Sequence, residues 1–193
     1  MIPLFEIKRS TIAGKGVFAI QNIYRNKTIT FLDGELCSLR EIIKRVKEGD
    51  EHISDPLAVA EEEYIDLDEI SRTFNHSCNP NAFIRGKNEL VALKDIKKGQ
   101  EITYDYSTTM SEDENKIKRL GWSLWNCVCH CGSPHCRGII DQFETLPQNT
   151  RYFYLHNKLV PEFILRMHGN TIGPENMHRQ VANARSDSDG KSC

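Results

Sequence analysis

The sequence lacks the hydrophobic runs that a membrane protein or a secreted protein would need. No apolar stretch approaches the ~18 residues of a membrane-spanning helix, and the opening segment MIPLFEIKRS holds no apolar core of signal-peptide length. An excess of either charge is also missing, because 25 Lys and Arg face 27 Asp and Glu, and no clear Lys/Arg-rich import tract is visible. We therefore expect an intracellular protein, of the cytoplasm or the nucleus, that binds neither a membrane nor nucleic acid directly.

What is present suits one globular domain with a small addition. The 193 residues are 39% hydrophobic and 27% charged, which leaves enough apolar material for a core. Short β-favouring runs, separated by Gly, Asn and Lys, lie at 4–8, 16–20, 27–32, 64–68, 82–85, 89–94 and 101–106. This pattern predicts a mainly β body with few helices.

One helix is predicted between these strands. Ser38 and Glu41 form a capping box at its start, and Gly49 ends it. The helix over 38–49 then carries one apolar stripe, made of Leu39, Ile42, Ile43 and Val46. The following stretch, 48–63, is acidic and contains Pro56, which predicts a loop or a weak helix.

Further helices are predicted toward the C-terminus. Ser111 with Glu114 gives a second capping box, which opens a charged helix ending near Gly121. Residues 150–169 predict two helices that pack on the body or serve as a partner surface, because they carry Tyr152, Phe153, Leu155, Leu159, Phe163, Ile164 and Leu165. From residue 170 onward the aromatics vanish, which predicts a disordered tail over 170–193.

The cysteines point to a metal rather than to disulfides. The segment CVCHCGSPHCRG (127–138) holds four of the seven Cys and two of the seven His. An odd count of Cys without an export signal favours a reducing compartment, where crowded thiols bind metal. Three thiolates, from Cys129, Cys131 and Cys136, could hold one tetrahedral structural zinc. The candidates for its fourth ligand are Cys127, His130, His135 and Cys78.

Five motifs occur in an order that resembles a known family. They are AGKGVFA (13–19), GE (34–35), NHSCNPN (75–81), ELVALKDIKKGQEITYDY (89–106) and CHCGSPHCRG (129–138). Over roughly residues 1–140 the chain resembles the SET-domain protein-lysine N-methyltransferases that carry a post-SET zinc segment. The resemblance implies a mainly β SET-domain fold of small curled sheets with knot-like C-terminal threading. It divides the chain into a SET domain (1–122), a post-SET zinc segment (123–140), a C-terminal helical segment (141–169) and the tail.

The resemblance also implies an activity and a set of site residues. The activity is methyl transfer from S-adenosylmethionine to the side-chain amine of a lysine in a protein substrate, a histone tail being one candidate. Tyr106 matches the catalytic tyrosine, and Tyr104 the position that governs how many methyl groups are added, here mainly one. The implied cofactor contacts are Ala13, Gly14, Lys15, Gly16, Asn75, His76 and Tyr106, and the implied structural zinc ligands are Cys78, Cys129, Cys131 and Cys136.

The chain departs from the sequence pattern of the family at two places, and two other functions are alternatives to methyl transfer. The Gly-Asn pair of many relatives is missing before the asparagine loop, where Thr73 and Phe74 stand instead. The insert between 34–35 and 64–68 is short, and the resemblance implies that substrate recognition lies in this region. A catalytically weak binding module of the same fold is one alternative. A zinc-ribbon nucleic-acid binder is the other, although 127–138 carries one Arg and no aromatic residue.

Overall fold

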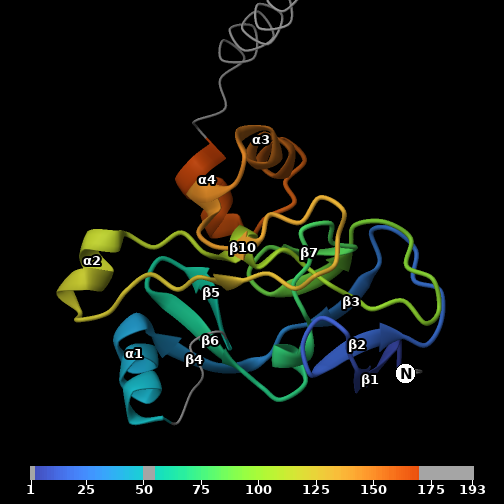
Figure 1. Cartoon of the computed structure of the whole chain (residues 1–193), viewed down its shortest axis with the longest axis horizontal. Helices are drawn as coiled ribbons and strands as arrows, with labels where there is room; N and C mark the ends of the chain where they lie inside the picture. Colours follow the sequence, from blue (N-terminus) through green and yellow to red (C-terminus); the bar gives the residue numbers. More distant parts are fainter. Residues whose placement is uncertain (1–2, 50–54, 170–193) are drawn as a thin grey trace, which may run out of the picture.

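Small antiparallel sheets form the body of the protein, which confirms the mainly β prediction (Figure 1). The computed structural model describes residues 3–49 and 55–169. In these residues β1 (Phe5–Arg9) pairs with β2 (Lys15–Ala19), β8 (Glu89–Ala92) lies between β3 (Thr28–Phe31) and β7 (Ala82–Arg85), β6 (Glu63–Leu67) lies between β4 (Gly34–Ser38) and β5 (Pro56–Ala60), and β9 (Cys127–Val128) pairs with β10 (Ile139–Ile140).

Helix α1 (Leu39–Glu48) has the ends that its sequence predicts. The Ser38 hydroxyl accepts a hydrogen bond from the Glu41 N–H at 3.2 Å, which satisfies one of the free donors of the first turn. At the other end Gly49 has a φ of 81°, a left-handed conformation that glycine adopts without a steric penalty. The apolar stripe faces inward, with Leu39, Ile42 and Ile43 buried.

The prediction of a loop or weak helix over 48–63 is wrong, because β5 occupies Pro56–Ala60. β5 is an edge strand that pairs only with β6, and Pro56 is its first residue, a position where a missing N–H costs no ladder hydrogen bond. Its three central residues, Leu57, Ala58 and Val59, are all buried. A strand buried on both faces shows no polar alternation, so the periodicity did not reveal it.

The segment 101–106 forms no regular strand, although its composition predicted one. It makes isolated bridges, between Glu101 and Phe18 and between Tyr104 and His76. Glu101 pairs with Phe18 of β2 and Tyr104 with His76 of the asparagine loop, so the segment changes partner and each pairing stops after a single residue. A short 3₁₀ helix, η2 (Tyr106–Thr109), follows directly.

The second predicted capping box is also wrong, because Ser111 does not cap the charged helix. Helix α2 (Glu114–Arg119) is capped by Asp113, whose carboxylate accepts from the Lys116 N–H at 2.8 Å. The Ser111 hydroxyl instead lies 2.5 Å from a Glu144 carboxylate oxygen and 2.9 Å from His168 Nε2. Tertiary contacts therefore hold the predicted cap residue away from the helix end.

Two hydrophobic clusters make the core, and the C-terminal helices close the second. The first lies among β2, β3, β7 and β8 and includes Val17, Phe74, Ile84 and Ile102. The second joins α1 to η3 (Phe143–Thr145), α3 (Gln148–His156) and α4 (Glu162–His168). Figure 1 shows α3 and α4 together at one end of the molecule. The predicted packing of 150–169 on the body is thus confirmed, whereas the predicted tail lies outside the described residues.

The register of α3 differs from the one expected. Phe153 is 48% exposed, whereas Tyr154 and Leu155 are buried.

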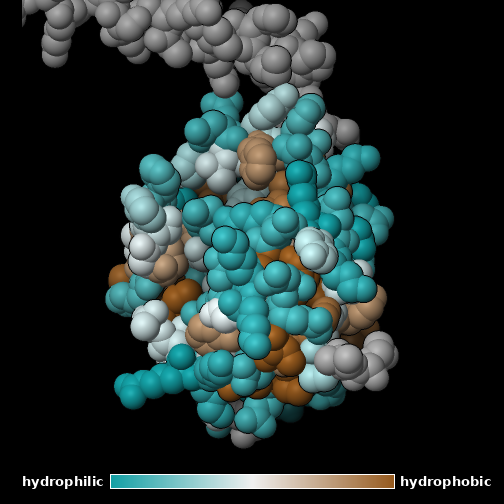
Figure 2. Space-filling model, turned by 90° about the vertical axis from the view of Figure 1, so that its right-hand side faces the viewer, coloured by the Kyte–Doolittle hydropathy of each residue, from teal (hydrophilic) through white to brown (hydrophobic). Residues whose placement is uncertain are grey.

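The surface on the side of β1–β3 is mostly hydrophilic, with a few hydrophobic patches in its lower half (Figure 2). In the described part of the chain, none of the helices has both the length and the apolar character to cross a bilayer.

Candidate active site and metal centre

The asparagine loop is tied to the glycine turn by the side chain of Asn75. Its amide nitrogen lies 2.8 Å from the Lys15 carbonyl oxygen and 3.5 Å from that of Ala13. The same nitrogen is 2.7 Å from Glu101 Oε1. Segments 60 residues apart in sequence are therefore held at one place, and Asn75 serves as the bridge between them.

The two glycines of this turn serve different purposes. Gly14 has a φ of 41° and nothing lies within 4 Å of where its Cβ would be, so the turn is open on that side. At Gly16 a Cβ would come within 2.1 Å of Glu101 Oε1 and 2.9 Å of the Ser10 Cβ. Glycine is required there by the packing of Glu101, whose carboxylate also accepts the Ser10 hydroxyl at 2.9 Å. The packing of Glu101 thus gives Gly16 a structural reason of its own, whereas the space beside Gly14 is free for a ligand.

The asparagine loop also pairs with the tyrosine segment. Ser77 N–H donates to the Tyr104 carbonyl at 3.1 Å, and Tyr104 N–H donates to the Asn75 carbonyl at 3.3 Å. Asn81 continues the pairing, since its Oδ1 accepts from the Thr103 N–H at 2.9 Å and its own N–H donates to the Thr103 carbonyl at 3.2 Å. The loop needs its asparagines because amide side chains supply both donors and acceptors where regular pairing ends.

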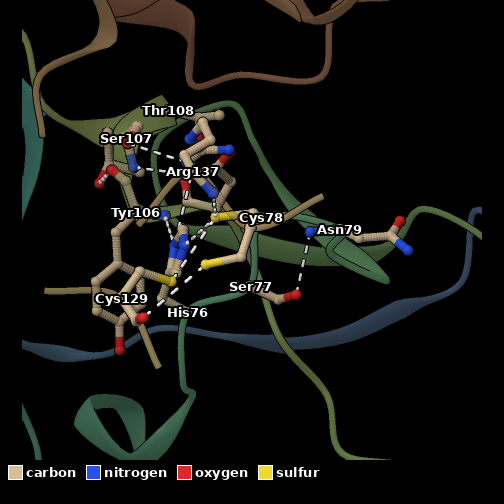
Figure 3. Close-up of polar contacts among 12 residues, drawn as sticks. His76, Ser77, Cys78, Asn79, Tyr106, Ser107, Thr108, Cys129 and Arg137 are labelled. Atoms are coloured by element: carbon tan, nitrogen blue, oxygen red, sulfur yellow. Dashed lines mark hydrogen bonds and ion pairs between the residues drawn. The ribbon is translucent and has the colours of Figure 1, made fainter. Parts of the chain in front are cut away.

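His76 lies between the tyrosine segment and the cysteines (Figure 3). The Tyr106 backbone N–H donates to its Nδ1 at 3.1 Å, so the ring hydrogen resides on Nε2, which is 3.3 Å from Cys78 Sγ. Burial lowers the pKa of His76 to about 4, with Asp105 opposing this effect, so the ring is neutral near pH 7. Such a ring can donate to a thiolate.

The two tyrosines predicted for catalysis lie together. The centroids of the Tyr104 and Tyr106 rings are 4.8 Å apart, as expected for residues that point to the same side. The Tyr106 hydroxyl donates to the Phe74 carbonyl at 2.7 Å. Burial raises the pKa of both tyrosines, so both hydroxyls keep their protons near neutral pH.

Both tyrosines line a cavity of about 90 Å³. This volume is far below the ~300–1,000 Å³ of pockets for drug-sized ligands, and suits a single linear side chain. The walls come from the apolar face of α1, from β5 and β6, and from the segment that contains α2. Besides the two tyrosines they include Ile43, Val46, Tyr64, Glu112, Ile117, Trp122, Trp125 and Gln142. The charged helix α2 thus contributes to the wall of this cavity through Ile117.

The four predicted zinc ligands come together in space. Cys78 Sγ is 3.7 Å from Cys129 Sγ, and the side chains of Cys131 and Cys136 are both within hydrogen-bonding reach of Cys129. Burial opposes ionisation of Cys131, but N–H groups of Cys78 and Ser133 and neighbouring thiols lower its pKa to about 7. Four thiols in one group match the preference of structural zinc. Among the described residues, the donor atoms of His76, Cys78, Cys129 and Cys131 all lie within 4.8 Å of one another, a group that includes His76 and leaves out Cys136.

A buried carboxylate, Asp105, connects the parts of the site and was not among the residues predicted from the sequence. Asp105 accepts two hydrogen bonds from the Arg137 guanidinium, at 2.9 and 2.7 Å. It also accepts from the Tyr154 hydroxyl at 2.9 Å and from the Ser107 N–H at 3.2 Å. One side chain thus joins the tyrosine segment to the cysteine segment and to α3. The Asp-Tyr pair of TYDY and the Arg after Cys136 were the available signals.

Removing Arg137 should destabilise the fold strongly. In Arg137→Ala the Asp105 carboxylate, whose side chain is only 1% exposed, would stay buried without its charged partner. Breaking such a pair from one side costs about 3–5 kcal/mol. Denaturant unfolding should show a loss of that size, and Arg119→Ala, on the exposed side of α2, should change stability little. A loss below 1 kcal/mol for Arg137→Ala would contradict this role of Asp105.

The region that contains the tyrosines and the asparagine loop matches a known protein family. The family model for the SET domain matches residues 14–107. The chain belongs to the SET-domain family. The matched range of this SET-domain protein contains the glycine turn, the asparagine loop and the tyrosine segment, whereas the cysteine segment 127–138 follows it.

Curated relatives resemble the SET-domain protein over a similar range. It is 32% identical over 148 residues to "Histone-lysine N-methyltransferase, H3 lysine-4 specific" of Schizosaccharomyces pombe, a match that covers 68% of this chain and 14% of the relative. It is 32% identical over 148 residues to "Variant-silencing SET domain-containing protein" of Plasmodium falciparum, covering 68% and 5%. It is 29% identical over 144 residues to "Histone-lysine N-methyltransferase, H3 lysine-36 specific" of Candida albicans, covering 68% and 16%.

A solved structure gives a more partial match. A chain of the humanized mutant of the Chaetomium thermophilum Polycomb Repressive Complex 2 is 22% identical, with a TM-score of 0.49, and the match covers 56% of this chain and 15% of that chain. The SET-domain protein therefore spans only a small part of the length of the proteins it matches.

Proposed function

We propose that this chain transfers a methyl group from S-adenosylmethionine to the side-chain amine of a lysine in a protein substrate. The observation that carries the proposal is the small cavity lined by Tyr104 and Tyr106 within a SET domain. A cavity of about 90 Å³ admits a linear side chain but excludes a metabolite of drug-like size. The names of two relatives specify histone H3, so histone H3 is the first substrate to test and the nucleus the first compartment.

The residues of the expected cofactor site fit a ligand such as S-adenosylmethionine. The turn is open at Gly14, beside the backbone of Ala13 and Lys15. In the parallel bridge between His76 and Tyr104, the hydrogen bonds are made by the neighbours of His76. The Asn75 carbonyl accepts from the Tyr104 N–H, and the Ser77 N–H donates to the Tyr104 carbonyl. The N–H and carbonyl of His76 therefore point to the opposite side, where they could pair with the edge of an adenine. We assign Ala13, Gly14, Lys15, Asn75, His76 and Tyr106 to this site; Gly16 contributes to it by admitting Glu101.

When bound, S-adenosylmethionine supplies a methyl group already activated on a positively charged sulfur. The chain must then provide a neutral, aligned amine and exclude water. The apolar walls disfavour the ammonium form of the lysine. The Tyr106 hydroxyl donates to Phe74 and keeps a lone pair that can accept an N–H of the amine. Alignment of reactants can contribute up to about 7–11 kcal/mol to such a step.

The test is transfer of labelled methyl from S-adenosylmethionine to core histones and to a cell lysate, with the modified lysine mapped by mass spectrometry. We expect label on lysine, and about a hundredth of that label or less in a parallel sample of the Tyr106→Phe protein at the same enzyme concentration and time. Cofactor binding without transfer to any protein would instead indicate the catalytically weak binding module.

We further infer one structural zinc held by Cys78, Cys129, Cys131 and Cys136. The proximity of the four thiols supports this set. His76 is the rival donor, but its Nδ1 accepts a backbone N–H, so its Nε2 carries a hydrogen and lacks the lone pair that a metal requires. We therefore assign His76 as a hydrogen-bond donor to the Cys78 thiolate, an outer partner that orients the ligand.

Replacing Tyr104 should change the number of methyl groups added. Tyr104 shares the cavity wall with Tyr106, so its hydroxyl occupies space that a methylated amine must enter to be turned for a second transfer. We expect mainly monomethyl-lysine from the unaltered chain, and in Tyr104→Phe a several-fold rise in the di- and trimethyl share. Mass spectrometry of early products measures both. Trimethyl-lysine as the main product of the unaltered chain would contradict the role given to Tyr104.

A further inference from the structure

One acidic side chain lies in the wall of the small cavity. Among the described residues that line it, Glu112 is the only carboxylate, and the others are apolar, aromatic or neutral. The Tyr64 hydroxyl donates to its Oε1 at 2.9 Å, and its own N–H donates to Gln142 Oε1 at 3.1 Å. Tyr64 is 8% exposed, so a buried partner fixes the carboxylate in place.

Glu112 also reaches water on its other side. It lines a second, open groove of about 590 Å³ together with Glu114, Asp141 and Glu144. Ser123, Leu124 and Gln142 belong to both linings. Glu112 therefore stands where the narrow cavity meets the wider groove, and lines both.

We infer that Glu112 accepts the proton that the substrate's ammonium group must lose before methyl transfer, an inference that rests on the proposed lysine methyl transfer. In this step an N–H bond of the ammonium breaks and its electron pair stays on nitrogen. An O–H bond forms on Glu112, which becomes a neutral carboxylic acid. The proton then passes to water in the open groove, and the carboxylate is restored.

The surroundings reduce the difference in proton affinity between the two groups. A free lysine holds its proton with a pKa near ~10.4 and a free glutamate near ~4.3, so transfer in water is unfavourable. Burial raises the pKa of Glu112, while the Tyr64 hydroxyl lowers it. The apolar walls lower that of an ammonium that enters. Both changes favour transfer, and the tyrosines cannot replace Glu112, since their hydroxyls are already protonated.

The groups that face Glu112 limit its titration. They are Tyr64 of β6, Tyr104 and Tyr106 of the tyrosine segment, Glu144 of η3, and Glu114, Lys118 and Asp141 around the open groove. Glu144 raises the pKa of Glu112. Lys118 pairs with Glu114 at 2.7 Å and so does not neutralise Glu112.

The test measures kcat as a function of pH for the unaltered full-length chain and for its Glu112→Gln and Glu114→Gln variants. The substrate is the histone or the lysate protein that accepts label. Glu112→Gln keeps an acceptor for Tyr64 but cannot take a proton. We expect its kcat to fall about 100-fold near pH 7 and to rise steadily with pH, because the substrate then supplies the neutral amine itself. The unaltered chain should reach a plateau above the pKa of Glu112 and lose activity as pH falls through it. Glu114→Gln, which removes a charge on the open side only, should follow the unaltered chain.

Two more variants separate proton transfer from a structural role. Glu112→Asp should retain the plateau at a lower rate, and Tyr64→Phe should move the acid limb of the profile to higher pH, because a hydrogen bond that lowers the pKa of Glu112 is lost. A Glu112→Gln profile parallel to that of the unaltered chain, or a kcat within twofold of it, would overturn the inference while leaving methyl transfer established. No transfer by the unaltered chain would instead overturn the proposed function, and this inference with it.

Discussion

Tyr106→Phe should reduce kcat about 100-fold or more, while the affinity for S-adenosylmethionine changes less than about threefold. The change removes one oxygen atom, which donates to the Phe74 carbonyl and lines the cavity wall. Without it the amine loses the group that aligns its lone pair with the methyl donor, and small errors in alignment cost large factors in rate. Single-turnover rates and a calorimetric titration of S-adenosylmethionine measure the two quantities.

Stability serves as the control for this variant. The lost hydrogen bond is worth about 1 kcal/mol, so the melting temperature should fall by only a few degrees and cannot explain a 100-fold loss. Tyr152→Phe is a matched comparison, because Tyr152 lies on α3 and does not line the cavity. Near-normal turnover in Tyr106→Phe would remove Tyr106 from the catalytic role, and loss of cofactor affinity would make it a binding residue instead.

The sequence predicted those parts of the molecule that local chemistry determines. The cap and stop of α1 depend on Ser38, Glu41 and Gly49, each acting on its own neighbours. Motif order identified the tyrosine pair, and Tyr104 and Tyr106 lie with their rings 4.8 Å apart. The mainly β body also followed, because short β-favouring runs alternate with turn residues along the chain, and the family resemblance implied that the sheets are small.

The sequence could not predict the contacts that depend on distant partners. β5 begins with Pro56, which indicates a strand end only once its edge position is known. Glu101 looked like an ordinary strand residue, yet Gly16, Ser10 and Asn75 are all arranged around its carboxylate. Such roles come from tertiary structure, and neither periodicity nor spacing in one sequence encodes them.

Glu112 shows the same limit at the site itself. In the sequence it stands inside an acidic run, S-E-D-E, where solvated carboxylates are the rule. The fold separates the members of this run, since Asp113 caps α2, Glu114 pairs with Lys118 and Glu112 turns toward Tyr64. Only the folded structure shows which of the three carboxylates meets the cavity.

Cys78→Ser should release the metal and weaken cofactor binding at the same time. Structural zinc in small domains is bound with about 10–16 kcal/mol at pH 7, a free energy that is shared with folding. A serine hydroxyl is a poor replacement for a thiolate, so the variant should lose zinc on dialysis against a chelator that leaves the unaltered chain loaded. The asparagine loop carries both Cys78 and the cofactor-facing backbone of His76, which links the two effects.

Cys127→Ser is the matched control for the ligand set. Cys127 lies in the same segment, but burial alone raises the pKa of its thiol, and the thiols within reach of Cys129 are Cys78, Cys131 and Cys136. We expect Cys127→Ser to keep one zinc per chain by elemental analysis, with an unchanged melting temperature, whereas Cys78→Ser contains less than a tenth of that zinc and melts at a lower temperature. The opposite pattern, with zinc lost in Cys127→Ser and kept in Cys78→Ser, would assign the fourth position to Cys127. It would also leave the asparagine loop joined to the cysteine segment only by weaker contacts, such as the Arg137 N–H that lies 3.4 Å from Cys78 Sγ.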